Sequence, residues 1–491
     1  MLYSCCVFAR CGLSIMLLDM SFFPENYKKG ITYYVSADGK GKGLSETDPM
    51  PFSDAVKQSY GPGDSLLLKR GDVFYGNINP EVSAQPDAPF VIGAYGTGPR
   101  PVISRAKYIT TGWVREERGF YRFDLTDVGS FEGVQDDGAN VGFMEDAGGV
   151  KHGIRRENAE NCKFQYDFYC DGGFIYVKTF ADPYLALGRL TLGNYHLWDP
   201  IIGISSNTEV RDLHIENGGY GITLRNVYDC RNLYIHDCVI QNIGGTKLGD
   251  GEGLVKAGNA IEFFGSAYNA LVERNIIRDT YDVGFTIQGG ADCHWEDVTV
   301  RHNIFAYNTQ AFEIWTDGAD DETKGVHGMN FIENLCVNQG EGWGTNARPD
   351  RIGGGGQVCS TDVLAYGYNA PVLKINITGN TFYNKSDLNR VYSVPSIGCR
   401  YFEEAFIDRN NIYFPSRHLI FAGTDDGDWE YGRIQLTFDG WQKKYGHDIN
   451  GAFYEIGGKD MSKMEETVHY SLDYDEIIET VKSNGIVLSF A

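Results

Sequence analysis

The sequence is short of basic residues and of proline, and it has no long apolar run. Its 491 residues include 43 Lys and Arg against 66 Asp and Glu, which gives a formal net charge of −23. Nucleic-acid binding needs clustered basic residues to replace counterions, so this balance argues against a nucleic-acid partner. No apolar run reaches the roughly 20 residues of a membrane span. The acidic surface also favours a neutral or weakly charged substrate over a polyuronate or a sulfated one.

Paired cysteine motifs are absent as well. None of the 11 cysteines forms a CxxC pair, so a zinc site has little support. The eight in the body of the chain are predicted to be free structural thiols: Cys162, Cys170, Cys230, Cys238, Cys293, Cys336, Cys359 and Cys399. Free thiols favour the cytoplasm, with secretion or cell-surface display as the alternative. Residues 1–30 resemble a poor signal peptide, because Arg10 interrupts their apolar run and Asp19 ends it.

Glycine and aromatic residues are plentiful, and seven stretches repeat one pattern. The 61 glycines, 31 tyrosines and 28 phenylalanines are typical of strands and turns. Each stretch alternates apolar and polar residues and then turns, at Asn217, Cys238, Asn275, Asn303, Asn334, Asn380 and Asn411. The uneven spacing of these turns predicts coils of constant cross-section with loops of variable length. Asparagine tolerates left-handed backbone and can bond to the next asparagine in a ladder. A β-propeller would need regular blades of four strands.

The predicted organisation is therefore an all-β parallel β-helix with a β-rich insertion and short capping helices. Residues 1–30 are a leader whose role the sequence leaves open. Residues 31–110 form the N-terminal cap and the first coils, and residues 111–195 form the insertion. The main coils and the expected active-site groove occupy 196–430, and a C-terminal coil and cap occupy 431–491. Helices expected near 52–58 and within 466–486 would cover the open ends of the strand stack.

Several segments resemble the pectate-lyase-like superfamily of right-handed β-helix proteins. They are YYVSADGKGKG, PGDSLLLKRGDVF, AYGTGPRPVI, the Asn-turn coils and LTFDGWQKKYGHDIN. The resemblance extends from about Tyr33 to the end of the chain. Residues 258–290, GNAIEFFGSAYNALVERNIIRDTYDVGFTIQGG, are most similar to β-helix glycoside hydrolases such as the lacto-N-biosidase family. That resemblance implies catalysis by acidic residues on the coil face without a metal.

The strands of this region superimpose as GITLR, AIEFF, GFTIQ and FEIWT. Alternate strand residues face opposite sides, so Ile222, Ile261 and Phe285 are predicted to point inward. Matching Phe312 with Phe285 keeps the register regular, whereas matching Ile314 would need a bulge. The regular register stacks Thr223, Glu262, Thr286 and Glu313 in one outward column and Arg225, Phe264, Gln288 and Trp315 in the next.

The outward column supplies the candidate catalytic residues. Glu262 and Glu313 lie two coils apart, so their backbones are expected to be roughly 10 Å from each other. Asp282 precedes the strand between them. Glycoside hydrolysis uses paired carboxyl groups about 5 to 9.5 Å apart. We expect Asp282 to be the acid and Glu262 or Glu313 to be the base or nucleophile, although these roles can be exchanged.

The candidate substrate-binding residues surround these acids. They are Trp315, Phe264 and Tyr281 as ring platforms, Gln288 and Arg225 as hydrogen-bonding groups, and Asp317. Trp295 and Trp343 are weaker candidates. Loops at 244–258 and 339–368 are expected to wall the groove. No cofactor is expected, apart from a minor possibility of Ca²⁺ bound by Asp317, Asp320 and Asp321.

Two other functions remain open at this point. A polysaccharide lyase acting on a uronate-containing glycan would need a base such as Lys256 or Lys324, with calcium or arginine to neutralise the uronate. A non-catalytic glycan-binding coil would need neither.

Overall fold

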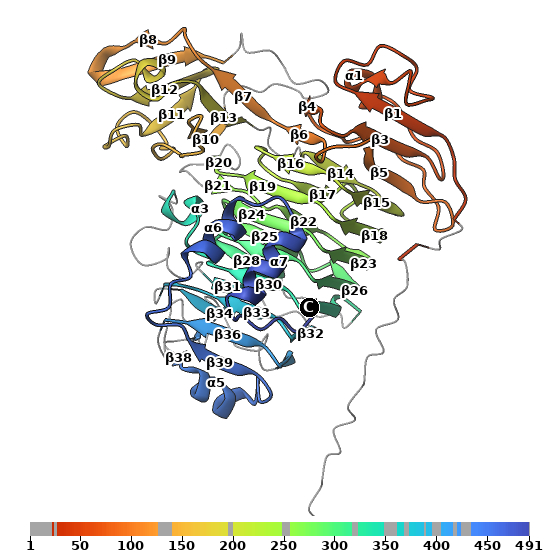
Figure 1. The fold of residues 1–491 in the computed structure, drawn as a ribbon, viewed down its shortest axis with the longest axis vertical. Coiled ribbons are helices and arrows are strands. Elements are labelled where there is room, and N and C mark those ends of the chain that lie inside the picture. Colours follow the sequence, from red (N-terminus) through yellow and green to blue (C-terminus); the bar gives the residue numbers. More distant parts are fainter. Residues whose placement is uncertain are drawn as a thin grey trace, which may run out of the picture.

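The computed structural model describes residues 22–23, 27–125, 140–194, 200–247, 256–316, 323–347, 361–367, 373–386, 389–394, 404–415, 420–423 and 434–490. These residues form a parallel β-helix in which three long sheets run the length of the coil (Figure 1). A separate group of antiparallel strands lies beside the N-terminal coils. The described helices are not long and apolar enough to span a bilayer.

The first sheet contains eleven strands. In spatial order they are β2 (Met50–Pro51), β1 (Thr32–Ser36), β3 (Ser65–Lys69), β5 (Phe90–Tyr95), β15 (Thr208–Arg211), β18 (Cys230–His236), β23 (Ala267–Glu273), β26 (His294–Arg301), β29 (Gly325–Ile332), β32 (Leu373–Thr378) and β35 (Phe406–Asp408).

The second sheet contains ten strands. They are β4 (Val73–Tyr75), β6 (Val102–Ser104), β16 (His214–Glu216), β19 (Val239–Ile243), β24 (Ile276–Thr280), β27 (Ile304–Ala306), β30 (Leu335–Val337), β33 (Thr381–Tyr383), β36 (Asn411–Phe414) and β39 (Ala452–Glu455).

The third sheet carries the candidate site. Its strands are β14 (Ile202–Ile204), β17 (Ile222–Leu224), β22 (Ile261–Phe264), β25 (Val283–Gly289), β28 (Gln310–Thr316), β31 (Thr361–Gly367), β34 (Arg390–Val394), β37 (Phe421–Gly423) and β38 (Ile434–Leu436). Its strands pair in parallel except β37 and β38, which are antiparallel. Inward side chains of all three sheets form one continuous apolar core.

A buried asparagine ladder stabilises the corner between the first and second sheets. The amide Nδ2 atoms of Asn275, Asn303, Asn334 and Asn380 each donate to the Oδ1 atom of the next asparagine, at 3.0 to 3.1 Å. The last member, Asn410, donates to Asp448 Oδ1 at 2.8 Å. The predicted ladder is therefore confirmed over these coils.

Three details of that prediction were wrong. The last ladder residue is Asn410, because Asn411 begins β36 and pairs with Thr381. Asn217 does not join the ladder, since it lies at the end of β16 and its N–H donates to the Asn242 carbonyl. Left-handed backbone belongs to the residue before each ladder position, such as Arg274 with φ 52°. The ladder side chain itself is selected for its hydrogen bonds, and its neighbour makes the bend.

The region between the first coils and residue 200 folds into two small antiparallel sheets. One contains β7 (Ala106–Ile109), β10 (Val141–Glu145) and β13 (Leu190–Asn194). The other contains β8 (Val114–Arg115), β9 (Phe120–Asp124), β11 (Phe168–Asp171) and β12 (Phe174–Lys178), and the helix α2 (Pro183–Leu187) follows it. These strands share an apolar core separate from that of the coil. We call this group the insertion.

The helices have a different placement from the one predicted. Near the N-terminus, α1 (Phe52–Ala55) is shorter than expected but packs on the coil core through Phe52 and Ala55. The C-terminal helices α6 (Ser462–Tyr470) and α7 (Tyr474–Ser483) do not cover the last coil. They lie across the outer face of the second sheet (Figure 1), in an apolar cluster with its strand residues.

The last coil is covered instead by α5 (Phe438–Tyr445). Its Trp441 has no exposed surface and stacks on Tyr392 and Phe421, with ring centroids 4.7 and 5.0 Å apart. Trp441 Nε1 donates to Asp448 at 3.2 Å, so the helix is also tied to the end of the asparagine ladder.

Candidate functional site

The register predicted for the third sheet is confirmed. Thr223 pairs with Glu262, Glu262 with Thr286, and Thr286 with Glu313, which makes one column across β17, β22, β25 and β28. The alternate residues are the apolar ones, and they are fully buried in the core: Ile222, Ile261, Phe285 and Phe312. Because strand side chains alternate between faces, both glutamates leave the core on the outward side.

Glu262 has the most perturbed environment of this column. Its side chain is only 7% exposed. Burial raises the pKa of the Glu262 carboxyl from 4.5 to about 8, and the charges of Glu313 and Asp282 add to this rise. A hydrogen bond from the Asn259 side chain lowers the pKa but does not offset the burial. Glu262 is therefore mainly protonated at neutral pH, and all three predicted acids are close enough to interact.

Glu313 is surrounded by hydrogen-bond donors. Its Oε2 atom accepts a hydrogen bond from Gln288 Nε2 at 2.7 Å and one from Thr286 Oγ1 at 3.3 Å. Gln288, predicted to bind substrate, thus has a visible role in orienting Glu313.

Asp282 lies at the corner just before β25, and its side chain is partly buried. Its backbone is held on both sides. Its N–H donates to the Gly258 carbonyl at 3.0 Å, and its carbonyl accepts hydrogen bonds from the N–H groups of Thr309 and Gln310, both at 3.1 Å. The carboxyl group therefore starts from a fixed point on the coil between those of Glu262 and Glu313.

The second predicted column is partly present. Phe264 pairs with Gln288, and Gln288 pairs with Trp315, in the next outward row. Phe264 is 40% exposed and Trp315 is partly exposed. Their rings can thus contact a sugar that lies across the outward face of the three strands.

Two other candidates have structural partners instead. Tyr281 has no exposed surface, so its ring cannot stack on a sugar, and it packs on Trp343 with ring centroids 5.5 Å apart. The Arg225 guanidinium donates to the Pro80 carbonyl and, at 2.7 Å, to Glu81 Oε1. Arg225 therefore fastens the segment around residue 80 to the coil. Of the weaker candidates, Trp295 is a core residue with no exposed surface.

Asp317, Asp320 and Asp321 lie outside the described residues, as do Cys359 and Cys399. Within the described part of the chain, no group of three or more His, Cys, Asp or Glu residues is placed to hold a metal ion. The other six predicted body cysteines are free thiols there.

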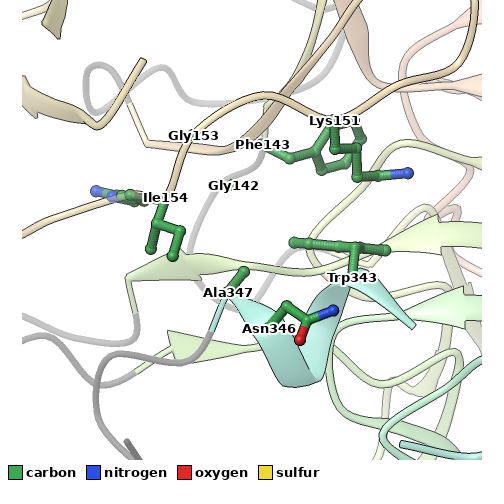
Figure 2. A pocket seen from close by; sticks show the side chains of 9 residues that line it. Gly142, Phe143, Lys151, Gly153, Ile154, Trp343, Asn346 and Ala347 are labelled. Carbon is green, nitrogen blue, oxygen red and sulfur yellow. The ribbon is translucent and has the colours of Figure 1, made fainter. Parts of the chain in front are cut away.

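A cavity that the sequence did not reveal lies beside the site, and Figure 2 shows its lining. It has a volume of about 210 Å³ and lies between the insertion and the short helix α3 (Trp343–Asn346). Phe143, Lys151 and Ile154 of the insertion face Trp343, Asn346 and Ala347. Trp343 was only a weak candidate, because its importance depends on insertion residues about 190 positions away in sequence.

Comparisons with known proteins identify the fold. Residues 201–327 match the family described as right handed beta helix region, in agreement with the predicted handedness. No curated protein matches the chain.

The similar solved structures are distant. A complex of XylC with xylose is 11% identical, with a TM-score of 0.46, over 86% of this chain and 75% of that one. A GH136 lacto-N-biosidase from Eubacterium ramulus is 13% identical, with a TM-score of 0.41, over 81% and 67%. An alginate lyase from Paenibacillus sp. str. FPU-7 is 11% identical, with a TM-score of 0.35, over 81% and 97%.

Proposed function

We propose that this right-handed parallel β-helix is a glycoside hydrolase acting on a neutral or weakly charged glycan. The observation that carries the proposal is the state of Glu262, a carboxyl group that burial keeps protonated near neutral pH beside two further acids. A glycosidase needs such a pair, one carboxyl group that holds a proton and one that does not.

The geometry supports a division of roles that differs from the one expected from sequence. Glu262, with its raised pKa, is the general acid that protonates the glycosidic oxygen as the bond to the sugar breaks. Glu313, hydrogen-bonded to Gln288 and Thr286, is the base that takes a proton from the attacking water. The negative charge of Asp282 helps to keep Glu262 protonated.

The separation of the two carboxyl groups sets the stereochemistry at the sugar carbon. Glu262 and Glu313 occupy one column two coils apart, so their backbones are roughly 10 Å from each other. Inverting enzymes hold their carboxyl groups about 6.5 to 9.5 Å apart to admit a water molecule, whereas retaining enzymes hold them about 5 Å apart. Phe264 and Trp315, in the adjacent row, supply apolar faces for the sugar rings.

The lyase alternative has less support in the described residues. Lys256, one of its candidate bases, is 3% exposed. Its ammonium donates to the Ala347 carbonyl at 2.6 Å and lies over the Tyr281 ring at 4.8 Å from the centroid. These contacts give the Lys256 ammonium a structural role as a cation and not the role of a base that takes a proton from a substrate.

The test is to screen a panel of oligosaccharides and then compare Glu262→Gln and Glu313→Gln with the wild type. Each substitution should lower kcat by about 100-fold or more, as loss of a general acid or base does. The matched control is Glu296→Gln, which removes a 53% exposed carboxylate from the first sheet and should leave activity unchanged.

The chemistry of the product decides the reaction class. Hydrolysis releases a reducing end without ultraviolet absorbance, whereas elimination creates an absorbing double bond. An absorbing product, or full activity in both variants, would reject the proposed hydrolase. The anomer released first, followed by NMR, distinguishes inversion from retention.

A further inference from the structure

We propose that the cavity between the insertion and α3 is a binding subsite for a single terminal sugar ring, so that the enzyme cleaves glycans from a chain end. This inference rests on the proposed function and adds to it a site and a mode of action. Four observations carry it: the size of the cavity, its lining, its contact with the catalytic corner, and the closure of one side.

The size of the cavity suits one ring and not a chain. Its volume is about 210 Å³, below the roughly 300 to 1,000 Å³ of pockets that hold drug-sized ligands. A chain of several sugars would have to leave it after the first ring. The remaining rings would then lie outside the cavity.

The lining combines apolar surfaces with polar groups, as a sugar requires. Trp343 supplies the partly exposed ring, which packs on the 3% exposed Phe143 with ring centroids 5.3 Å apart, and Ile154 faces it across the cavity (Figure 2). The Asn346 amide lies on the α3 side. Aromatic faces suit the C–H groups of a pyranose, and an amide can both donate to and accept from hydroxyl groups.

The α3 wall of the cavity is in direct contact with the catalytic corner. The Trp343 ring packs on Tyr281, the residue before Asp282, and Trp343 Nε1 donates to the Asp279 carbonyl at 2.8 Å. The fit is tight at Gly344, where an added Cβ atom would lie 2.4 Å from the Tyr281 carbonyl oxygen. The α3 wall of the cavity is therefore packed directly against the corner that carries Asp282.

The opposite wall is fastened to the coil, which closes this end. Lys151 Nζ donates to Asn242 Oδ1 of β19 at 2.8 Å and pairs with Glu145 at 2.9 Å. Asn140 exchanges two hydrogen bonds with the backbone of Lys247, at 3.0 and 3.1 Å. The described part of the insertion is thus fastened to the coil on this side of the cavity, where the end of a bound glycan chain would stop.

The experiment changes the volume of the cavity from the insertion side, away from the catalytic residues. Ile154→Trp should fill it. The control is Leu185→Ala, which changes an 82% exposed residue of α2 outside the cavity lining. The products formed from an end-labelled oligosaccharide are followed by chromatography. The wild type and Leu185→Ala should release one short product from the start, with no intermediate lengths. Ile154→Trp should lose at least about 10-fold in kcat/KM with an unchanged unfolding midpoint.

A second measurement does not depend on turnover. Glucose, xylose, galactose, N-acetylglucosamine and galacturonate are soaked separately into crystals of Glu262→Gln. Density for a ring against Trp343 supports the inference, and galacturonate alone would show that the site selects an acidic sugar. An empty cavity in every soak overturns the inference, as does an early ladder of product lengths. Failure of the proposed function looks different, since Glu262→Gln would then keep full activity.

Discussion

At the scale of single residues, two buried glutamates show how neighbours decide the behaviour of a carboxyl group. Glu262 and Glu273 are 7% and 4% exposed. Burial alone would raise both pKa values. Glu273 accepts a hydrogen bond from Tyr234 and pairs with Arg301 and Arg274, and these contacts lower its pKa despite the burial. Burial raises the pKa of Glu262, where no cation among the described residues offsets it, and the two acids beside it add to the rise. The first arrangement stabilises the fold, and the second costs stability.

This contrast predicts opposite effects of the same substitution on stability. The folded protein holds the Glu262 proton up to about pH 8, whereas the unfolded chain releases it near pH 4.5. Stability therefore falls as the pH rises through this window. Glu262→Gln stays neutral, so it should be more stable than the wild type at about pH 8 by on the order of 1–3 kcal/mol, with the gain shrinking towards pH 4.5.

The control is Glu273→Gln. The pKa of Glu273 is lowered, so its contribution is present above the unfolded pKa and is lost as the pH falls. This variant should be less stable than the wild type at about pH 8, and the difference should shrink in acid. Urea unfolding of the three proteins at several pH values measures both effects. Equal stabilities at pH 8 would contradict the account of Glu262.

The residues that sequence could and could not predict differ in where their partners lie. The column of Glu262 and Glu313 follows from the alternation within short strands, which is a local property. The contacts of Arg225 and Tyr281 depend on Glu81 and Trp343, which lie in segments distant in sequence. Nothing in the residues around either one indicates these partners.

At the scale of elements, the same distinction separates the coils from the helices. The coil register was predictable because each strand repeats the alternation of the last. The position of α6 and α7 was missed, although a signal for it exists. Strands of the second sheet carry adjacent apolar residues, such as Val239 with Ile240 and Ile276 with Ile277. A strand that is apolar on both faces needs a cover on its outer side, and the helices supply it.

The asparagine ladder gives a prediction at this scale. Asn334 donates to the Val300 carbonyl and to Asn380, and its Oδ1 atom accepts two hydrogen bonds from Asn303. Asn334→Leu leaves these buried partners unpaired, each at a cost of about 1–3 kcal/mol. We expect a total loss of about 3–5 kcal/mol in the free energy of unfolding, measured with urea.

The matched variant is Asn330→Leu on the same coil. Asn330 is partly exposed on the outer face of β29, donates a hydrogen bond to the Thr299 hydroxyl and accepts one from the Asn376 amide. Water can replace these bonds, so the loss should stay below about 1 kcal/mol. Similar losses in the two variants would show that the buried ladder contributes no more to the free energy of unfolding than exposed amide hydrogen bonds do.

At the scale of the whole molecule, net charge is the dominant electrostatic property. The charge of −23 repels itself across the coil, and this repulsion opposes the compact state. The Debye length falls from about 30 Å at 0.01 M salt to about 8 Å at 0.15 M. Raising sodium chloride over that range should therefore raise the Tm, by about 1–3 °C for a chain of this size.

Calorimetry at the two salt concentrations checks this expectation. The surface also carries attractive pairs, such as Arg231 with Asp229 at 2.6 Å, both about half exposed. Salt weakens these pairs as well, but exposed pairs contribute little to stability. A Tm that falls with added salt would mean that local pairs outweigh the repulsion.

The hydrogen bonds of the asparagine ladder all run in one direction, and the chemistry of the side chains determines where the ladder ends. Every ladder asparagine donates a hydrogen bond to the residue one coil further on, and its Oδ1 atom accepts one from the coil before. Asp448 accepts from Asn410, Tyr392 and Trp441, and an ionised carboxylate has no proton to pass on. The ladder therefore ends at Asp448. This acceptor limits the number of coils, as does the helix α5 that covers the last coil.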